Sequence, residues 1–449
     1  MRLLPPRGIK DPIVCPCRFP CLCIPCPVLA CPPPRISVFR ALCFPIPFLR
    51  ISARSNATSA NLVGPIDALS TLDQLQRLDL SSNSEVKALP QSFTKLKKLS
   101  HLNVNGCSIK GRIPAFLGQL TALTYLSIGD NSFEGALPSS LGSLVNLVFL
   151  NIGGTGEDGV GGALPASFAN LTKLKELYLH NNRFSGPLPD FIGSFTKLEQ
   201  LMVSKNRWEG AIPKTFSKLK KLRLLGLMET SLEGEIPTFL GALEHLTYLS
   251  LSDTRLYGEV PKALSGLAKL RELYLQNALF YGPISGLSTL KQLTLIDLSS
   301  NYFSGPIPAF LQRVKKVNAA DNYFSGSASS LPCSDDFSLG GNCLVSVSPK
   351  CGESAAQKSA AECNKFCGTA TATGACSGKG VCVMDVDQSL GSQAFVPACK
   401  CQAGFWASHK KQRRTTLEAP QKAPQKPGGV LGLAQEAALH QEKLLNGCY

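Results

Sequence analysis

The sequence lacks any long apolar run. Nowhere do about 18 apolar residues, the length that a membrane-spanning helix needs, follow one another without a charge or a proline. The best stretch, 41–49, contains Pro45 and Pro47. A clean export signal is also missing, because prolines and Arg18 interrupt the apolar segment 13–30. We therefore expect no membrane span in this sequence, and any membrane association would go through a partner.

Side chains in catalytic arrangements are also scarce. Of the five histidines, none stands at a recognisable catalytic spacing from a serine or cysteine, and no pair of carboxylates suggests an acid–base couple. The motif GxGxxG at 154–159 falls in an insertion loop without a following helix, and Glu157 and Asp158 would repel a phosphate. The sequence thus predicts a protein that is not an enzyme and that needs no cofactor or metal.

Acidic residues are outnumbered, with 31 Asp and Glu against 46 Lys and Arg, so the net charge is +15. A basic excess favours polyanionic partners, without choosing among nucleic acid, anionic lipid and acidic polysaccharide. Only 17% of residues are charged and 44% are hydrophobic, which excludes a wholly disordered chain. The 39 glycines and 31 prolines exclude a long coiled coil.

The 18 cysteines are unevenly distributed: seven lie between Cys15 and Cys43, ten between Cys333 and Cys448, and Cys107 stands alone. Such density in short segments is typical of disulfides and of an oxidising compartment. We therefore expect the middle of the chain to be held by packing and the C-terminal part by disulfides. This expectation conflicts with the missing export signal, and the sequence leaves that conflict open.

The middle of the chain is an internal repeat. The pattern LxxLxxLxLxxNxFxGxLP recurs eleven times from Leu72 onward, mostly in steps of 24 residues. Its LxL part alternates as a short strand must, and one unit cannot bury its own leucines, so units must stack into a solenoid. The asparagine should point inward and bond to buried backbone groups. This position is occupied by Asn83, Cys107, Asn131, Thr155, Asn182, Asn206, Thr230, Thr254, Ala278, Asn301 and Asn322.

The repeat ends in GxIPxxLGxL, as in Gly111 to Leu120. This tail resembles the plant-specific leucine-rich repeat of polygalacturonase-inhibiting proteins and of receptor-like protein and receptor kinase ectodomains. The resemblance implies an α/β repeat solenoid, a curved horseshoe with a parallel β-sheet on its concave face. It implies little about function, because the class is defined by its scaffold. No kinase motif follows the repeats.

The pattern divides the chain into five segments. Residues 1–59 are rich in Cys and Pro and do not resemble the paired-cysteine cap of the family; we interpret them as disordered or misassigned, with a cysteine-based metal site as the alternative. The solenoid covers 60–326. Residues 327–362 form a cysteine-containing cap, 363–405 a cysteine-rich module, and 406–449 a basic linker with a short helix at 430–445.

The cysteine-rich module ends in CxCxxGF, and five residues separate Cys376 from Cys382. This spacing resembles an EGF-like module, and the resemblance implies the pairs Cys367–Cys382 and Cys376–Cys399. The last cysteine of such a module is absent near Cys401, so that residue is either unpaired or bonded to Cys448. A zinc site is the alternative. If the chain is exported, Asn56 and Asn170 are N-glycosylation acceptors.

Residues between the strand leucines should face outward on the concave side of the solenoid. Large apolar and aromatic side chains gather there although the fold does not need them, and such groups are enriched in binding sites. The alternative is that these aromatics are incidental. We expect the following to project into solvent and contact a partner: Tyr125, Phe149, Tyr178, His180, Met202, Met228, Tyr248 and Tyr274.

Basic residues precede the strands, which places them along one edge of the horseshoe, while acidic residues cluster toward the concave side. We expect this basic edge to bind polyanions; it comprises Lys97, Lys98, Lys173, Lys197, Lys220, Lys221, Arg223 and Lys269. Two functions remain open. The first is an extracellular receptor-like or decoy module that binds a protein or peptide on the concave face. The second is a cell-wall inhibitor or adaptor that binds acidic polysaccharide through the basic edge.

Overall fold

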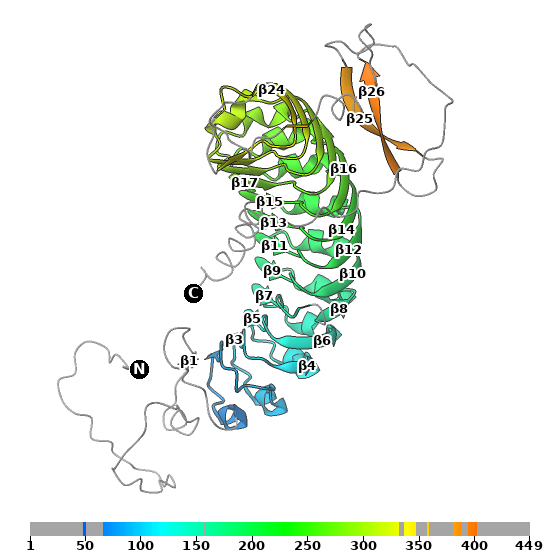
Figure 1. Cartoon of the computed structure of the whole chain (residues 1–449). Coiled ribbons are helices and arrows are strands. Elements are labelled where there is room, and N and C mark those ends of the chain that lie inside the picture. The colour runs from blue at the N-terminus through cyan, green and yellow to red at the C-terminus, as the bar shows by residue number, and fades with distance from the viewer. Residues whose placement is uncertain are drawn as a thin grey trace, which may run out of the picture.

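The computed structural model describes residues 48–50, 66–156, 159–331, 336–346, 357–358, 380–387 and 394–401. The repeats stack into a curved solenoid (Figure 1). Within these residues, no helix has the length and apolar character required to cross a bilayer. The expected leucine-rich repeat architecture is confirmed.

A 13-stranded parallel sheet lines one side of the solenoid. Each strand is two or three residues long, and the strands from β2 to β21 each carry a buried leucine, isoleucine or valine at the centre. The strands follow one another in chain order: β1 (Phe48–Arg50), β2 (Arg77–Asp79), β3 (His101–Asn103), β5 (Tyr125–Ser127), β7 (Phe149–Asn151), β9 (Glu176–Tyr178), β11 (Gln200–Met202), β13 (Leu224–Gly226), β15 (Tyr248–Ser250), β17 (Glu272–Tyr274), β19 (Leu295–Asp297), β21 (Lys316–Asn318) and β23 (Phe337–Ser338).

A second parallel sheet of 11 strands follows the turn after each first-sheet strand. Its strands are β4 (Lys110–Arg112), β6 (Ser132–Ala136), β8 (Val160–Gly162), β10 (Arg183–Pro187), β12 (Arg207–Gly210), β14 (Ser231–Glu235), β16 (Arg255–Glu259), β18 (Leu279–Gly282), β20 (Tyr302–Pro306), β22 (Tyr323–Ser327) and β24 (Cys343–Ser346). Separately, β25 (Gly380–Asp387) and β26 (Ala394–Cys401) form an antiparallel hairpin.

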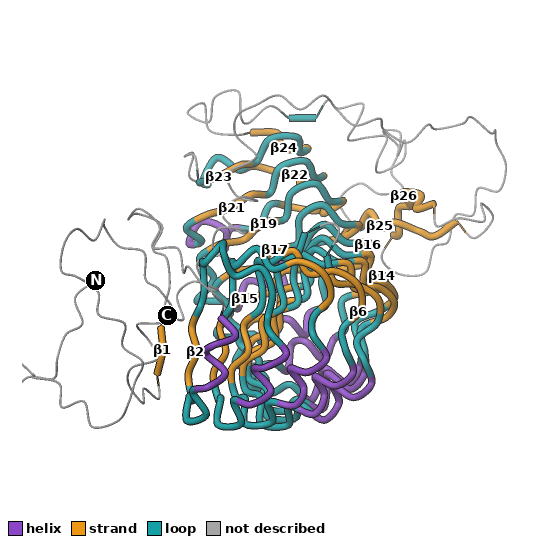
Figure 2. Tube along the Cα trace, turned by 90° about the horizontal axis from the view of Figure 1, so that it is seen from below, coloured by secondary structure: helices purple, strands orange, loops and turns teal. Residues whose placement is uncertain are grey.

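Short 3-10 helices complete each unit and lie together on the side away from the first sheet (Figure 2). Most begin directly after a proline, whose fixed φ and missing N–H suit a helix start. They are η1 (Ile66–Thr71), η2 (Gln91–Lys95), η3 (Ala115–Gln119), η4 (Ser139–Ser143), η5 (Ala166–Asn170), η6 (Asp190–Ser194), η7 (Lys214–Lys218), η8 (Thr238–Ala242), η9 (Lys262–Gly266), η10 (Ser285–Thr289) and η11 (Ala309–Arg313).

The leucines of all three faces meet in one continuous core between the sheets and helices. Rows of aromatic rings run through this core behind the second sheet; for example, Phe280, Phe303 and Phe324 stack at 6.2 and 6.1 Å between ring centroids. Phe184 stacks on Trp208 in the same way. Each unit therefore gains most of its apolar contacts from its neighbours, as expected for a solenoid.

The inward asparagine behaves as the sequence predicts. The Asn131 amide donates to the carbonyls of Val104, Ile128 and Gly129, and its oxygen accepts from the N–H groups of Cys107 and Ile109. Asn131 and the later inward asparagines thus each join their own unit to the one before it, and we call each of them a rung. Threonines do less: the hydroxyls of Thr230 and Thr254 donate to the carbonyls three residues earlier.

The array extends beyond the eleven units read from the sequence. Asn342 repeats the rung, because its amide donates to the carbonyls of Ala319 and Leu339 and its oxygen accepts from the Phe324 N–H. Strands β23 and β24 extend both sheets at this end. The signal was present as Leu339-x-x-Asn342-x-Leu344, but shorter spacing and flanking glycines and cysteines obscured it. At the other end, β1 pairs with β2 although it lies in the segment expected to stand outside the solenoid.

Candidate concave-face binding site and basic edge

The strand register brings the candidate side chains into rows. Across β3, β5 and β7, His101 pairs with Tyr125 and Tyr125 with Phe149. Across β9 and β11, Tyr178 pairs with Met202 in the neighbouring row. Equivalent positions of successive repeats therefore lie side by side on the first sheet, in two neighbouring rows.

The first row begins with a stack of three rings, which we call the aromatic ladder: His101, Tyr125 and Phe149. Their ring centroids are 3.9 and 4.1 Å apart with interplanar angles of 13° and 9°. All three side chains are half-buried. The rings cover one another's faces, so mainly their edges are open to a partner. His101 was not among the binding residues expected from the sequence, and its stacking on Tyr125 adds it to this group.

The ladder continues into a second apolar cluster that is separate from the leucine core. Its members are Tyr178, Met202, Leu224, Tyr248 and Tyr274, and Phe149 and Leu295 pack against it. Phe149 joins the two parts through a tilted contact with Tyr178 at 5.5 Å.

The expectation that these side chains project into solvent is wrong for five of the eight candidates. Their exposed fractions are 0% for Met202, 1% for Tyr178 and Tyr274, and 3% for Met228 and Tyr248. The physical reason is lateral packing, since side chains on adjacent parallel strands stand about 4.8 Å apart and bury one another. Of the remaining candidates, Tyr125, Phe149 and His180 are half-buried.

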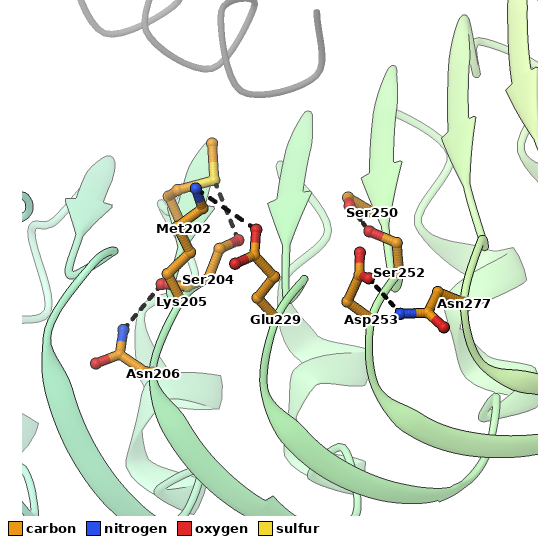
Figure 3. A network of polar contacts seen from close by, with 9 residues as sticks. All are labelled: Met202, Ser204, Lys205, Asn206, Glu229, Ser250, Ser252, Asp253 and Asn277. Carbon is orange, nitrogen blue, oxygen red and sulfur yellow. Dashed lines mark hydrogen bonds and ion pairs between the residues drawn. The ribbon is translucent and has the colours of Figure 1, made fainter. Parts of the chain in front are cut away.

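Glycine makes room for this lateral packing. A Cβ at Gly226 would lie 2.2 Å from the Met202 sulfur, so only glycine lets that side chain lie over β13. The Ser204 hydroxyl also contacts the Met202 sulfur at 3.8 Å. Beside this contact, Lys205 forms an ion pair with Glu229 at 3.5 Å, and Asn277 donates to Asp253 (Figure 3). Polar side chains that follow the first-sheet strands therefore form contacts with one another beside the apolar cluster.

Two of the three tyrosine hydroxyls in the cluster contact polar groups of neighbouring side chains. The Tyr178 hydroxyl contacts Glu176 and Gln200 at 2.8 Å each, and the Tyr274 hydroxyl donates to Glu272 at 3.1 Å. Burial raises the pKa of Tyr274, and the adjacent Glu272 carboxylate raises it further. Tyr274 therefore remains neutral at physiological pH.

Two histidines on this face are held neutral. Burial lowers the pKa of His101 to about 4, and the nearby Arg77 adds to the effect. Burial likewise lowers the pKa of His180 to about 4, with Lys205 as the second cause. At one end of the face, burial raises the pKa of Asp297 even though Ser299 and Asn318 donate to its carboxylate.

The basic edge lies where the sequence places it. All eight predicted cations are exposed and precede first-sheet strands. Three of them, Lys221, Arg223 and Lys269, line a shallow cavity of about 290 Å³. Glu199, His245 and Thr247 complete its wall, and Glu199 also pairs with Lys175 at 3.5 Å. The cavity therefore concentrates positive charge at one point of the edge.

The other sequence-based candidates fall largely outside the described residues. Asn170 is exposed at the end of η5, as a glycosylation acceptor must be, whereas Asn56 lies outside. Cys343 is disulfide-bonded. In the hairpin, backbone register sets Cys382 opposite Cys399, while Cys367 and Cys376 lie outside. No group of three or more potential metal ligands occurs in the part of the chain that is described.

Comparison with known proteins identifies the repeat. The Leucine Rich Repeat family matches residues 98–120, 122–144, 173–195, 245–267 and 292–314. No curated protein matches the chain significantly.

Solved structures with the same fold include plant receptor ectodomains. The ectodomain of the receptor kinase GASSHO1/SCHENGEN3 from Arabidopsis thaliana, solved in complex with CASPARIAN STRIP INTEGRITY FACTOR 2, is 30% identical over 66% of this chain and 38% of its own, with a TM-score of 0.57. The Arabidopsis HAESA ectodomain, with an IDA peptide hormone, is 29% identical over 64% of this chain and 53% of its own, with a TM-score of 0.54.

The plant peptide hormone receptor RGFR1, in complex with RGF2, is 26% identical over 62% of this chain and 53% of its own, with a TM-score of 0.51. The chain therefore spans between 38% and 53% of the length of these three structures. The chain thus contains leucine-rich repeats, and its solenoid resembles the ectodomains of plant receptor kinases.

Proposed function

We propose that this protein is a non-enzymatic extracellular recognition module, receptor-like or decoy, that binds a protein or peptide on its concave face. The observation that carries the proposal is the aromatic ladder of His101, Tyr125 and Phe149. The leucine core does not include these rings, so the solenoid does not need them for its own packing. The similar ectodomains of HAESA and RGFR1 were solved with peptide hormones or ligands, which supports the same class of partner here.

Because the second cluster is buried, we place the proposed contact surface in the N-terminal half of the concave face. The buried members of the second cluster offer little area, whereas Tyr125 and Phe149 remain half-exposed. We assign the partner's main apolar contact to the aromatic ladder and treat the second cluster as its rigid support. Rigid aromatics lose little conformational entropy on binding, which favours them as hot spots.

Ring geometry favours a peptide over a sugar on this face. A sugar stacks on an open ring face, but the near-parallel rings 3.9 and 4.1 Å apart cover their own faces. Ring edges with neighbouring amides suit a peptide better: the Asn151 amide contacts Asn105 and Ser127 beside the ladder, at 3.3 and 3.4 Å. Those amides could exchange partners with a peptide backbone at little cost, since their present bonds are long.

Selection from a linear peptide library on the full chain tests the proposal. Peptides selected by the unmodified protein should bind Tyr125→Ser and Phe149→Ser at least tenfold more weakly, because hot-spot truncations commonly cost about 2 kcal/mol. Val145→Ser is the matched control, since Val145 is 44% exposed and lies outside the ladder. Equal binding by all three variants would contradict the proposal.

The second candidate function is that of a cell-wall inhibitor or adaptor that binds acidic polysaccharide. The cavity lined by Lys221, Arg223 and Lys269 favours it. Exposed charges are screened over about 8 Å at physiological ionic strength, so such binding should weaken with salt. A variant with Lys220, Lys221 and Arg223 changed to Ser should elute earlier from a pectate column; unchanged retention would remove this candidate.

A further inference from the structure

Among the described residues, the C-terminal unit of the solenoid has no following repeat whose asparagine could bond its buried backbone groups, as happens in internal units. Asn131, Asn206, Asn301 and Asn322 each donate to a carbonyl of the preceding unit and accept an N–H from it. The last rung, Asn342, bonds backward to Ala319 and Phe324 in the same way. Its own unit needs the corresponding partners from whatever follows, because buried backbone groups must be paired.

Gln357 supplies those partners. In a regular rung, the amide donates to the carbonyl three residues before the previous asparagine, and its oxygen accepts the N–H two residues after that asparagine. Counted from Asn342, these groups are the Leu339 carbonyl and the Leu344 N–H. The Gln357 amide donates to the Leu339 carbonyl at 3.2 Å, and its oxygen accepts from the Leu344 N–H at 3.4 Å.

Lys358 also forms hydrogen bonds with the last units of the solenoid. The Lys358 N–H donates to the Asn342 carbonyl at 2.7 Å. Its ammonium donates to the Asn322 carbonyl at 2.8 Å and to the Gly341 carbonyl, and it lies 4.6 Å from the centre of the Tyr323 ring. One side chain thus ties two successive units, and its charge faces an aromatic ring, an arrangement that stabilises a partly desolvated cation.

We infer that Gln357 and Lys358 form a terminal strap, in which Gln357 acts as the last rung of the ladder without being part of a repeat. The side chain of glutamine is one methylene longer than that of asparagine, so it can reach the rung position from outside the strand–turn geometry. The strap completes the hydrogen bonding of the last unit. It lies within the cap expected at 327–362.

Local hydrogen exchange in the full chain tests the strap, because exchange reports the opening of individual units. Gln357→Leu keeps the bulk but removes both polar groups, and should speed exchange of the Leu344 amide and its neighbours on β24 about tenfold or more. Gln357→Glu keeps the acceptor but loses the donor, so the exchange rate of its Leu344 amide should lie between the rates of Gln357→Leu and the unmodified protein. Exchange in β3 and β5 should stay unchanged in both variants.

Two controls separate the strap from a general loss of stability. Gln119 is an exposed glutamine on η3, so Gln119→Leu should leave exchange at β24 unaltered. Lys358→Met should speed exchange in β22 and β24, whereas Lys218→Met, at an exposed lysine on η7, should not. If the amides of β22 and β24 exchange in both Gln357→Leu and Lys358→Met at the same rate as in the unmodified protein, the proposed strap is refuted.

Discussion

Truncation of one asparagine rung gives the sharpest test of how the solenoid is held together. Asn131 is 5% exposed and makes five hydrogen bonds, three through its amide and two through its oxygen. In Asn131→Ala, the N–H groups of Cys107 and Ile109 lose the only acceptor that the structure gives them among its described residues.

The cost follows from those two orphaned donors. A buried donor without a partner costs about 1–3 kcal/mol, so the variant should lose about 2–6 kcal/mol of unfolding free energy. A loss of this size is a large fraction of the total for a typical domain, which is about 5–15 kcal/mol. The unfolding free energy of Asn131→Thr should lie between those of Asn131→Ala and the unmodified protein. A threonine hydroxyl replaces only part of the asparagine's hydrogen bonds, as Thr254 does with one bond each to Leu251 and Leu256.

Urea unfolding followed by far-ultraviolet circular dichroism measures this difference. Asn146→Ala is the control, since the Asn146 amide bonds to the Thr121 carbonyl at an exposed position. The control should change the unfolding free energy by less than about 1 kcal/mol. A loss in Asn131→Ala no larger than in the control would refute the view that the rungs hold adjacent units together.

Three further predictions follow from the same geometry. Ala278→Asn should raise the unfolding free energy by about 1 kcal/mol, because it restores a missing rung; a lower midpoint in urea would contradict this. Tyr178→Ala should cost about 2–4 kcal/mol, because the ring is buried in the second cluster, and a neutral result would mean that it is not packed there. The pKa of His101, about 4 in the folded protein, lies below its unfolded value, so its contribution to stability is present above pH 6.5 and lost as the pH falls from there through about 4. His101→Gln should therefore unfold with a weaker pH dependence over this range than the unmodified protein, and an identical dependence would exclude His101 as a source.

The sequence predicted the solenoid because the repeat pattern and the chemistry of its residues agree at every unit. Leucines at fixed spacing had to be buried, and an inward asparagine had to bond backbone groups, which Asn131 and Asn301 do. The strand register of the concave rows followed from the same period. These features depend only on positions within one unit, which a sequence displays directly.

What the sequence could not supply was burial on the concave face. Alternation along a strand says which side a residue faces, but the exposure of Tyr178 or Met202 depends on side chains of neighbouring strands, such as Gln200, which lies 22 residues from Tyr178. Gly226 illustrates this, because its missing side chain leaves the space that Met202 fills.

The central claim is that the aromatic ladder, rather than the basic edge, contacts the partner. Photocrosslinking tests it most directly, with benzoylphenylalanine placed at position 125 in the ladder or at position 145, which precedes β7 on the same side as the basic residues. A peptide selected on the unmodified protein should crosslink from position 125 and not from position 145. Crosslinking from position 145 alone would contradict the claim and favour binding along the edge.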